Sequence, residues 1–410
     1  MERFFKDPHI IARKRAGPLG LYIDELAQHF AEKGYSRSYA RRQLQLADEF
    51  GRWLQRHTVA LADLKAEQPR SFLRYRARFR KPRQGDLAAC KSVYDLLRQK
   101  GLIAALPIPE RLPVGRLSDE FSLYLRQERQ LASTTVTRYA GLVEDWLTDR
   151  FGSEQVNLSR LSTAEIVGYI QRLAPTMARK CAKVMATAFR SFLQYARYRG
   201  YIQLDLAASI PPIADWSRTS IPRSLPVEHV QQVLVHCNRE TGTGRRDYAI
   251  LLLLARLGLR AGEVASLTLD DIDWQGGYIT VRDKGGRGDE LPLPSDVGKA
   301  IVDYLKRGRP HSKNRRVFLR ARAPVAGFKD QRSVGTVVRH ALGRAGIDSP
   351  RKGAHQFRHA LASEMLRSGA SLTEIGELLR HRHPQTTTIY AKVDLASLQT
   401  LALPWPGGGR

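Results

Sequence analysis

Two proline-bearing stretches constrain the fold most, because they interrupt a chain whose remaining pattern is largely helical. The first covers residues 106–113 and the second extends from 210 to 226. Proline fixes its own φ, lacks an amide donor and disfavours helical geometry in the residue before it, so each stretch is predicted to be an extended linker. A chain of 410 residues is long enough for two or three hydrophobic cores. We therefore predict three domains and a flexible tail, at 1–105, 117–205, 225–402 and 403–410.

The charge of the chain points to a polyanionic partner. Its formal net charge is +27 at pH 7, with 67 Lys and Arg against 40 Asp and Glu, and the basic residues are spread along the whole chain. A surplus of this size attracts nucleic acid or an anionic membrane surface. The sequence has no apolar run of membrane-spanning length, no signal-peptide pattern and no lipidation motif. Double-stranded DNA is therefore the expected partner, and no membrane association is expected.

The cysteines do not form a recognisable framework. Cys90, Cys181 and Cys237 are far apart in the sequence and include no CxxC pair. Free cysteines of this kind are usually small buried residues. All three are predicted to be reduced packing residues.

Residues 117–205 show the periodicity of amphipathic helices. Apolar residues recur at helical spacing in four stretches, 121–125, 136–147, 164–173 and 182–198. Ser162 is followed three residues later by Glu165, as in a capping box, so a helix is predicted to begin there. The expected structure is a small basic helical bundle.

The N-terminal segment echoes this middle segment. The run from Lys91 to Ile103 parallels the run from Arg190 to Ile202, and residues 35–42 loosely parallel residues 131–138. One interpretation is a degenerate internal repeat. The alternative is a chance similarity, because amphipathic helices that contain Arg and Ser and stop at Gly look alike.

A dense group of cations also marks the N-terminal segment. Its members are Arg13, Lys14 and Arg15, the pair Arg41 and Arg42, and the run Arg74, Arg76, Arg78, Arg80, Lys81 and Arg83. Such neighbours repel one another unless phosphates lie nearby. The segment is therefore interpreted as an additional helical domain that contacts DNA or another protomer, with a solvated basic face as the simpler alternative.

The third segment combines helices with a hairpin. The apolar run at 248–255 is too short to span a membrane and predicts a buried core helix, just beyond which Arg260 lies. Alternating residues at 278–282 and 290–293 flank a Gly-rich turn, which predicts a hairpin with Lys284 at the end of its first strand. Further helices are predicted at 295–306, 333–345, 356–367 and 372–379, followed by a loop and a helix that carries Tyr390. The expected fold class is mainly α with a small antiparallel β-sheet.

Six polar residues of this segment suit phosphoryl transfer. They are Arg260, Lys284, His355, Arg358, His381 and Tyr390. A DNA phosphodiester is an anion, and guanidinium groups can stabilise the charge that develops on its oxygens because they stay cationic and present planar donor pairs. A phenol, with a free pKa of about 10, can both attack phosphorus and later leave again. Taken singly each residue could be an ordinary surface or packing residue, but their order and contexts agree with one site.

Three local sequences carry a resemblance to a known family. They are Leu257 to Glu263, His355 to His359, and Leu378 to Tyr390, and together they resemble the tyrosine recombinase (phage integrase) family. The resemblance implies that Tyr390 attacks DNA, forms a 3′-phosphotyrosyl link and releases a 5′-hydroxyl. It also implies the roles of the other residues: Lys284 protonates the departing oxygen, His355 assists proton transfer at Tyr390, His381 binds the phosphate, and Glu263 and His359 support the arginines.

The same resemblance predicts the setting of the reaction. It implies site-specific DNA strand exchange without ATP, metal or other cofactor, by an integrase that moves or resolves a bacterial mobile element. The middle bundle is expected to grip DNA, and a C-terminal helix at 395–401 is expected to dock on a neighbouring protomer within a homotetramer on synapsed DNA. Related recombinases encoded nearby are expected partners, and the bacterial cytoplasm, at the nucleoid, is the expected location.

Two departures and two alternatives accompany this hypothesis. Arg380 stands where the family usually has glycine, and is expected either to add a phosphate contact or to reposition His381; Phe357 stands where leucine is usual. A DNA-binding protein with an inactive or partner-dependent recombinase fold is the first alternative. A zinc hydrolase is the second, because His355 and His359 are four residues apart, although Gln356 replaces the glutamate expected there.

Overall fold

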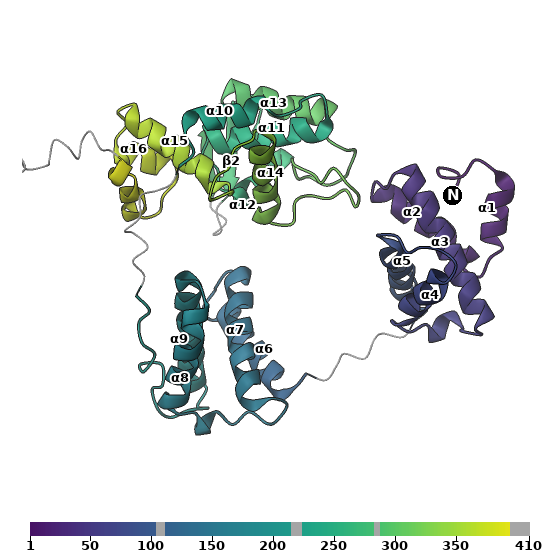
Figure 1. The fold of residues 1–410 in the computed structure, drawn as a ribbon, viewed down its shortest axis with the longest axis horizontal. Coiled ribbons are helices and arrows are strands. Elements are labelled where there is room, and N and C mark those ends of the chain that lie inside the picture. The colour runs from purple at the N-terminus through teal and green to yellow at the C-terminus, as the bar shows by residue number, and fades with distance from the viewer. Residues whose placement is uncertain (104–110, 215–223, 283–287, 394–410) are drawn as a thin grey trace, which may run out of the picture. The chain divides into compact units, whose positions relative to one another are not determined.

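The computed structural model describes residues 1–103, 111–214, 224–282 and 288–393 (Figure 1). These residues form mainly helices, together with one three-stranded antiparallel sheet. The predicted fold class is confirmed. The chain divides into two compact units, Pro107–Ser220 and the combination of Met1–Leu106 with Ile221–Arg410.

The N-terminal helices surround a hydrophobic cluster drawn from residues 1–103. They are α1 (Pro8–Arg15), α2 (Gly20–Glu32), α3 (Arg37–Arg56), α4 (Gln68–Ala77) and α5 (Asp86–Gln99), with the 3₁₀ turn η1 (Leu61–Asp63) after α3. The long helix α3 is central, because it packs against α2, α4 and α5. Its side chains Leu44 and Phe50 are fully buried.

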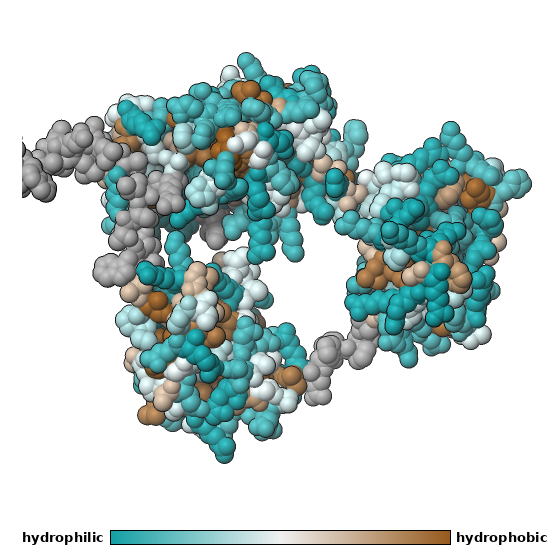
Figure 2. Space-filling view, viewed as in Figure 1, coloured by the Kyte–Doolittle hydropathy of each residue, from teal (hydrophilic) through white to brown (hydrophobic). Residues whose placement is uncertain are grey.

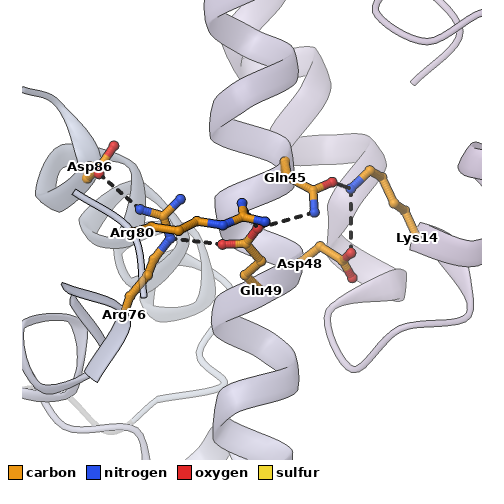
Figure 3. A network of polar contacts seen from close by, with 7 residues as sticks. All are labelled: Lys14, Gln45, Asp48, Glu49, Arg76, Arg80 and Asp86. Atoms are coloured by element: carbon orange, nitrogen blue, oxygen red, sulfur yellow. Dashed lines mark hydrogen bonds and ion pairs between the residues drawn. The ribbon is translucent and has the colours of Figure 1, made fainter. Parts of the chain in front are cut away.

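Polar contacts reinforce this cluster (Figure 3). Lys14 of α1 is only 1% exposed and reaches α3, where its Nζ lies 2.7 Å from Oε1 of Gln45 and 3.5 Å from Oδ2 of Asp48. Burial lowers the pKa of Lys14, and the carboxylate of Asp48 opposes that shift. On the other side of α3, Glu49 pairs with Arg76 and Arg80, and Arg76 also pairs with Asp86 at the start of α5. The network therefore connects α1, α3, α4 and α5.

The middle residues form a four-helix bundle with its own cluster, drawn from Val114 to Ile210. Its helices are α6 (Pro113–Gln127), α7 (Ser133–Phe151), α8 (Thr163–Leu173) and α9 (Arg179–Tyr198), with the 3₁₀ turns η2 (Leu158–Arg160) and η3 (Ala174–Thr176). The predicted capping box is present: Oγ of Ser162 accepts from the amide of Glu165, whose carboxylate accepts from the amide of Ser162. The predicted bundle is confirmed.

The third segment has the small sheet on a helical core. Its helices are α10 (Val227–Val235), α11 (Gly242–Arg256), α12 (Ala261–Ser266), α13 (Ser295–Arg307), α14 (Gln331–Arg344), α15 (His355–Arg367) and α16 (Leu372–Leu378), with the 3₁₀ turns η4 (Leu269–Asp271), η5 (Pro384–Ile389) and η6 (Ala391–Val393). The predicted core helix corresponds to α11, which packs against the five helices α10 and α12 to α15. Residues 249–254 within it are buried, so this prediction is confirmed.

The sheet has the order β1-β2-β3, formed by β1 (Ile272–Asp273), β2 (Tyr278–Arg282) and β3 (Gly288–Pro292). The predicted hairpin is confirmed by the antiparallel register, which pairs Tyr278 with Pro292 and Arg282 with Gly288. Ile279 and Leu291 face the core as a directly opposed pair, which fixes the register. Lys284, which comes between these strands in the sequence, lies outside the described residues.

Three expectations are wrong in detail. Pro113 begins α6 instead of ending a linker, because proline in the first helical turn sacrifices no hydrogen bond. Cys181 is exposed at the start of α9, whereas Cys90 and Cys237 are buried as expected. Tyr390 does not lie on a helix: it is the residue that ends the 3₁₀ turn η5. The predicted helix at 395–401 lies outside the described residues.

The face drawn in Figure 2 is dominated by hydrophilic residues, with scattered hydrophobic patches. Among the described residues, no helix is both long enough and apolar enough to cross a membrane.

Candidate active site

Arg260 is held at the start of α12 by Glu263. The backbone amide of Arg260 donates to Oε2 of Glu263 at 2.7 Å, and its Nη1 donates to Oε1 at 2.7 Å. The Glu263 side chain is 6% exposed, whereas the Arg260 side chain is 38% exposed. One carboxylate therefore fixes both the backbone and the guanidinium of Arg260, and leaves part of that guanidinium open to a ligand.

Gly258 brings Arg260 and Arg358 into one site. It has a φ of 56°, which turns the chain at the end of α11, and a Cβ atom there would lie 2.7 Å from Cδ2 of Leu379. Its carbonyl accepts a hydrogen bond from Nη1 of Arg358. The close approach of this glycine lets α15 and the end of α16 meet the chain just before Arg260.

Arg358 is the most deeply placed cation of the site. It is 4% exposed on α15, and its other hydrogen bond goes to the carbonyl of Leu379. Burial, together with the positive charges of Arg260 and Arg380, lowers the pKa of Arg358 to about 10. It therefore remains charged at neutral pH, although both of its recorded acceptors are neutral carbonyls.

Arg380 completes a group of three guanidinium groups. Its φ is 53°, the left-handed conformation that favours glycine, which explains why a glycine suits this position. Its side chain is 8% exposed, and its Nη2 donates to Oε2 of Glu263 at 2.7 Å. Nη1 of Arg380 is buried without a hydrogen-bond partner among the residues that the structure describes. Sequence reasoning noticed this residue but did not foresee its pairing with Glu263.

The charges of this group do not balance. Arg260 and Arg380 both pair with the buried carboxylate of Glu263, whereas Arg358 bonds to carbonyl oxygens and only experiences the charge of Glu263. The more distant Asp289 lies 3.8 Å from Nε of Arg380. Excess positive charge in a partly buried place favours an anionic ligand, and guanidinium groups match the geometry of a phosphate.

Tyr390 is paired with His359. The phenol is 1% exposed, and its Oη lies 2.9 Å from Nδ1 of His359. Burial raises the pKa of Tyr390 to about 12, although the nearby charge of Arg358 opposes the shift. Burial also lowers the pKa of His359 to about 4, helped by His355 and Arg358. At neutral pH the pair therefore consists of a neutral phenol and a neutral imidazole.

The other two histidines flank this pair. His355 starts α15, and its ring centroid lies 6.3 Å from that of His359. Desolvation and the charges of Arg358 and Arg260 lower the pKa of His355. The resemblance gave the role of assisting Tyr390 to His355, but the imidazole that hydrogen-bonds the phenol is His359.

His381 is oriented by Thr387. Its Nδ1 lies 2.7 Å from Oγ1 of this threonine, which is 3% exposed. Burial, followed by the charges of Arg358 and Arg260, lowers the pKa of His381 to about 4. Thr387 was missed by sequence reasoning; the only signal was the run of three threonines just before Ile389 and Tyr390.

The site thus gathers most of the expected residues. Arg260, Glu263, His355, Arg358, His359, His381 and Tyr390 are linked by the hydrogen bonds, ring contact and charge interactions above. Lys284 lies outside the described residues. Within the described ranges, no three His, Cys, Asp or Glu side chains are grouped so that they could hold a metal ion.

The fold and the site define a protein of the integrase class, and the comparisons agree. Residues 223–396 match the model of the phage integrase family, and residues 119–200 match the model of the phage integrase N-terminal SAM-like domain. The relative named integrase/recombinase y4rA, from Sinorhizobium fredii strain NGR234, is 46% identical over 409 residues, which cover 99% of each chain. The chain belongs to the phage integrase family of tyrosine recombinases.

Two solved structures share the fold. A XerH site-specific recombinase bound to palindromic difH substrate, in a post-cleavage complex, is 17% identical with a TM-score of 0.56, and the match covers 82% of this chain and 94% of XerH. A lambda integrase (75–356) dimer bound to a COC′ core site is 16% identical with a TM-score of 0.52, covering 67% of this chain and 94% of that one.

Proposed function

We propose that the protein cuts and rejoins duplex DNA at specific sites through a 3′-phosphotyrosyl intermediate on Tyr390, and so moves or resolves a mobile element. One observation carries the proposal: a buried phenol paired with a neutral imidazole belongs to the same site as three guanidinium groups, two of which pair with one buried carboxylate. Family membership supports the same activity.

The reaction balances with the residues of this site. Oη of Tyr390 forms a bond to phosphorus while the bond from phosphorus to the 5′ oxygen breaks. The phenolic proton passes to Nδ1 of His359, which is neutral and 2.9 Å away. Lys284, by its family role, supplies a proton to the departing 5′ oxygen. The reverse sequence, with a new 5′-hydroxyl as the attacking group, rejoins the strands.

The cations stabilise the charge that develops during this exchange. Arg260 and Arg358 would bind the non-bridging oxygens, and a preorganised donor in such a site typically contributes about 10²- to 10³-fold in rate. The unpartnered Nη1 of Arg380 is a further donor available in the same group. Glu263 holds two of these guanidinium groups in place without contacting the reacting atoms.

The decisive test uses the nucleophile. Wild type and Tyr390→Phe are expressed with the DNA that flanks the gene, the samples are denatured, and the DNA that stays covalently attached is sequenced. We expect wild type to retain one defined sequence by its 3′ end and the variant to retain none. If both bind DNA and neither retains it, the protein is a DNA-binding protein with an inactive or partner-dependent site.

Assembly is part of the proposal. By family resemblance, four protomers would act on two synapsed DNA duplexes, with residues 394–410 docking on a neighbour. Deleting residues 394–410 should then abolish cooperative binding to paired sites in a gel-shift assay while leaving single-site binding intact. Unchanged cooperativity would remove this segment from the assembly contact. Related recombinases encoded nearby stay proposed partners; their effect on cooperativity can be measured by adding them to the same assay.

A further inference from the structure

The N-terminal helices repeat the internal design of the middle bundle. The order helix, helix, 3₁₀ turn, helix, helix describes α2, α3, η1, α4 and α5, and it equally describes α6, α7, η2, α8 and α9. The packing partners also correspond. In each set the first helix packs on the second. The last helix packs on the other three: α5 on α2, α3 and α4, and α9 on α6, α7 and α8.

The buried positions of the last helices match residue by residue. Along α5 the buried residues include Ala89, Cys90, Val93, Tyr94 and Leu97. Along α9 they include Ala188, Phe189, Phe192, Leu193 and Ala196, at the same spacing. Both helices then stop at a left-handed glycine, Gly101 with a φ of 70° and Gly200 with a φ of 76°. The same hydrogen bond caps both helix ends: the amide of the residue after the glycine donates to a carbonyl of the last turn, from Leu102 to Leu97 and from Tyr201 to Ala196.

The second helices match in the same way. In α3 the residues Ala40, Leu44, Ala47 and Phe50 are buried, and in α7 the residues Val136, Ala140, Val143 and Trp146 are buried at identical spacing. A 3₁₀ turn follows each helix, and each turn is followed by a buried leucine, Leu64 or Leu161. Chance similarity of amphipathic helices does not explain matching stops, turns and buried positions in one order.

The two sets also carry cations at the same edge. In the middle bundle, Nη2 of Arg138 on α7 lies 3.6 Å from Sγ of Cys181, so the starts of α7 and α9 adjoin. Exposed Arg138, Arg179 and Lys180 lie at this edge. In the N-terminal set, Oη of Tyr39 lies within 2.6 Å of where a Cβ on Gly85 would be, so the starts of α3 and α5 adjoin as well.

The corresponding N-terminal edge contains both structural and available cations. Arg76 is 18% exposed and pairs with Glu49 at 2.9 Å and with Asp86 at 3.4 Å, and Arg80 pairs with Glu49 at 3.0 Å (Figure 3). These two arginines therefore stabilise the fold, and only part of the cation group predicted from sequence needs phosphates.

Four cations of the run from Arg74 to Arg83 have exposed side chains that pair with no carboxylate among the described residues: Arg74, Arg78, Lys81 and Arg83. Arg74 donates to Oγ of Ser71, so Arg78, Lys81 and Arg83 are the three considered for a ligand. Phe79, between them in the sequence, is 72% exposed and stacks edge-on against Tyr75. Exposed cations without carboxylate partners are typical of a surface that contacts the phosphates of a nucleic acid.

We propose that residues 1–103 are a second copy of the helical module of residues 113–210, and that the edge with Arg78, Lys81 and Arg83 binds the phosphates of duplex DNA. This inference rests on the proposed function, because that function supplies DNA as the polyanion. It assigns a DNA-binding role to a segment that the integrase family models matched here do not cover.

The test compares two triple variants of the full chain. The first replaces Arg78, Lys81 and Arg83 by alanine, and its matched control replaces the exposed cations Arg56, Lys65 and Arg70 of the same helical set. Binding to a short duplex of arbitrary sequence is measured over a range of salt concentrations. We expect the slope of log affinity against log salt to fall by about 2–3 for the first variant, because each lost phosphate contact contributes about 0.9, and to stay unchanged for the control.

A crosslinking experiment tests whether the side chain at position 81 lies close to the bound DNA. Cys181 is the exposed thiol of the three cysteines, so Cys181→Ser provides the background. A photoactivatable thiol reagent is attached to Lys81→Cys or, as control, to Lys65→Cys, and the complex with duplex DNA is irradiated. We expect DNA crosslinks from position 81 and none from position 65.

The outcomes separate the inference from the proposed function. Equal salt slopes for the two triple variants, or crosslinks from position 81 to another protein chain in place of DNA, overturn the inference while covalent capture through Tyr390 stands. A wild-type protein that binds no duplex overturns both. Matching urea midpoints for the two triple variants show that any difference in slope does not come from unfolding.

Discussion

Nδ1 of His359 lies 2.9 Å from Oη of Tyr390, and both groups are neutral at neutral pH. A neutral imidazole can accept the proton that the phenol must lose, whereas an imidazolium could not. The family resemblance assigned this task to His355, which lies one helical turn earlier on α15. The two histidines can be separated by experiment.

His359→Gln should reduce the rate of covalent DNA capture by about 10²- to 10⁴-fold, the usual contribution of a positioned proton acceptor. Duplex binding should be unchanged, since the arginines remain. His355→Gln is the matched control, and it should lose less because its ring is not hydrogen-bonded to the phenol. The measurement is the single-turnover yield of protein–DNA adduct on a nicked substrate; a greater loss in the His355 variant would return the role to that residue.

Acid should weaken the catalytic segment through its buried histidines. In the unfolded chain His359 titrates near ~6.5, but burial lowers its folded pKa to about 4. Between these values the unfolded state binds more protons, so stability falls as pH falls through this window. His359→Gln should therefore show a smaller drop in urea midpoint between pH ~7 and pH ~5 than wild type. An equal drop would mean that this imidazole is already solvated in the folded protein.

Arg380→Gly should destabilise the protein despite relieving its backbone. Glycine removes the left-handed strain of a φ of 53°, which costs about 1–2 kcal/mol in other residues. However, losing one partner of the buried pair with Glu263 costs about 3–5 kcal/mol. The expected net loss in the free energy of unfolding is about 1–4 kcal/mol, measured by urea titration. Arg380→Lys retains the charge and should lose less; a more stable glycine variant would show that the ion pair contributes nothing.

One thiol should react quickly in the native protein. Cys181 is exposed, whereas Cys90 and Cys237 are buried, and burial raises the pKa of Cys90 to about 12. Treatment of the folded protein with DTNB should therefore release one equivalent rapidly and the other two only after denaturation. Cys181→Ser should abolish the fast phase; if it persists, one of the buried thiols is accessible through local opening.

Much of this fold could be predicted from the sequence, because strong periodicity marks its elements. The core helix at 248–255, the capping box at Ser162 and the hairpin after Tyr278 depend on local patterns that tertiary packing does not override. Most of the candidate site was also predictable, since each motif stays local in sequence.

The remainder depends on contacts that the sequence does not encode locally. Arg380 meets Glu263 across more than a hundred residues, so only the fold reveals that the glycine position holds an ion pair. Likewise, the choice between His355 and His359 depends on which face of α15 meets Tyr390, and the short turn η5 replaces the expected helix. The exposure of Cys181 could not be predicted for the same reason, because burial depends on tertiary packing.

The burial of Tyr390 has a consequence for the cell that harbours this protein. At 1% exposure, the phenolic oxygen is out of reach of any phosphodiester until the segment from Pro384 to Val393 shifts. If Tyr390 is the nucleophile, a protomer in this conformation therefore holds its attacking oxygen away from DNA. If DNA cleavage is its activity, this burial prevents cleavage of chromosomal DNA until the correct complex exposes the phenolic oxygen.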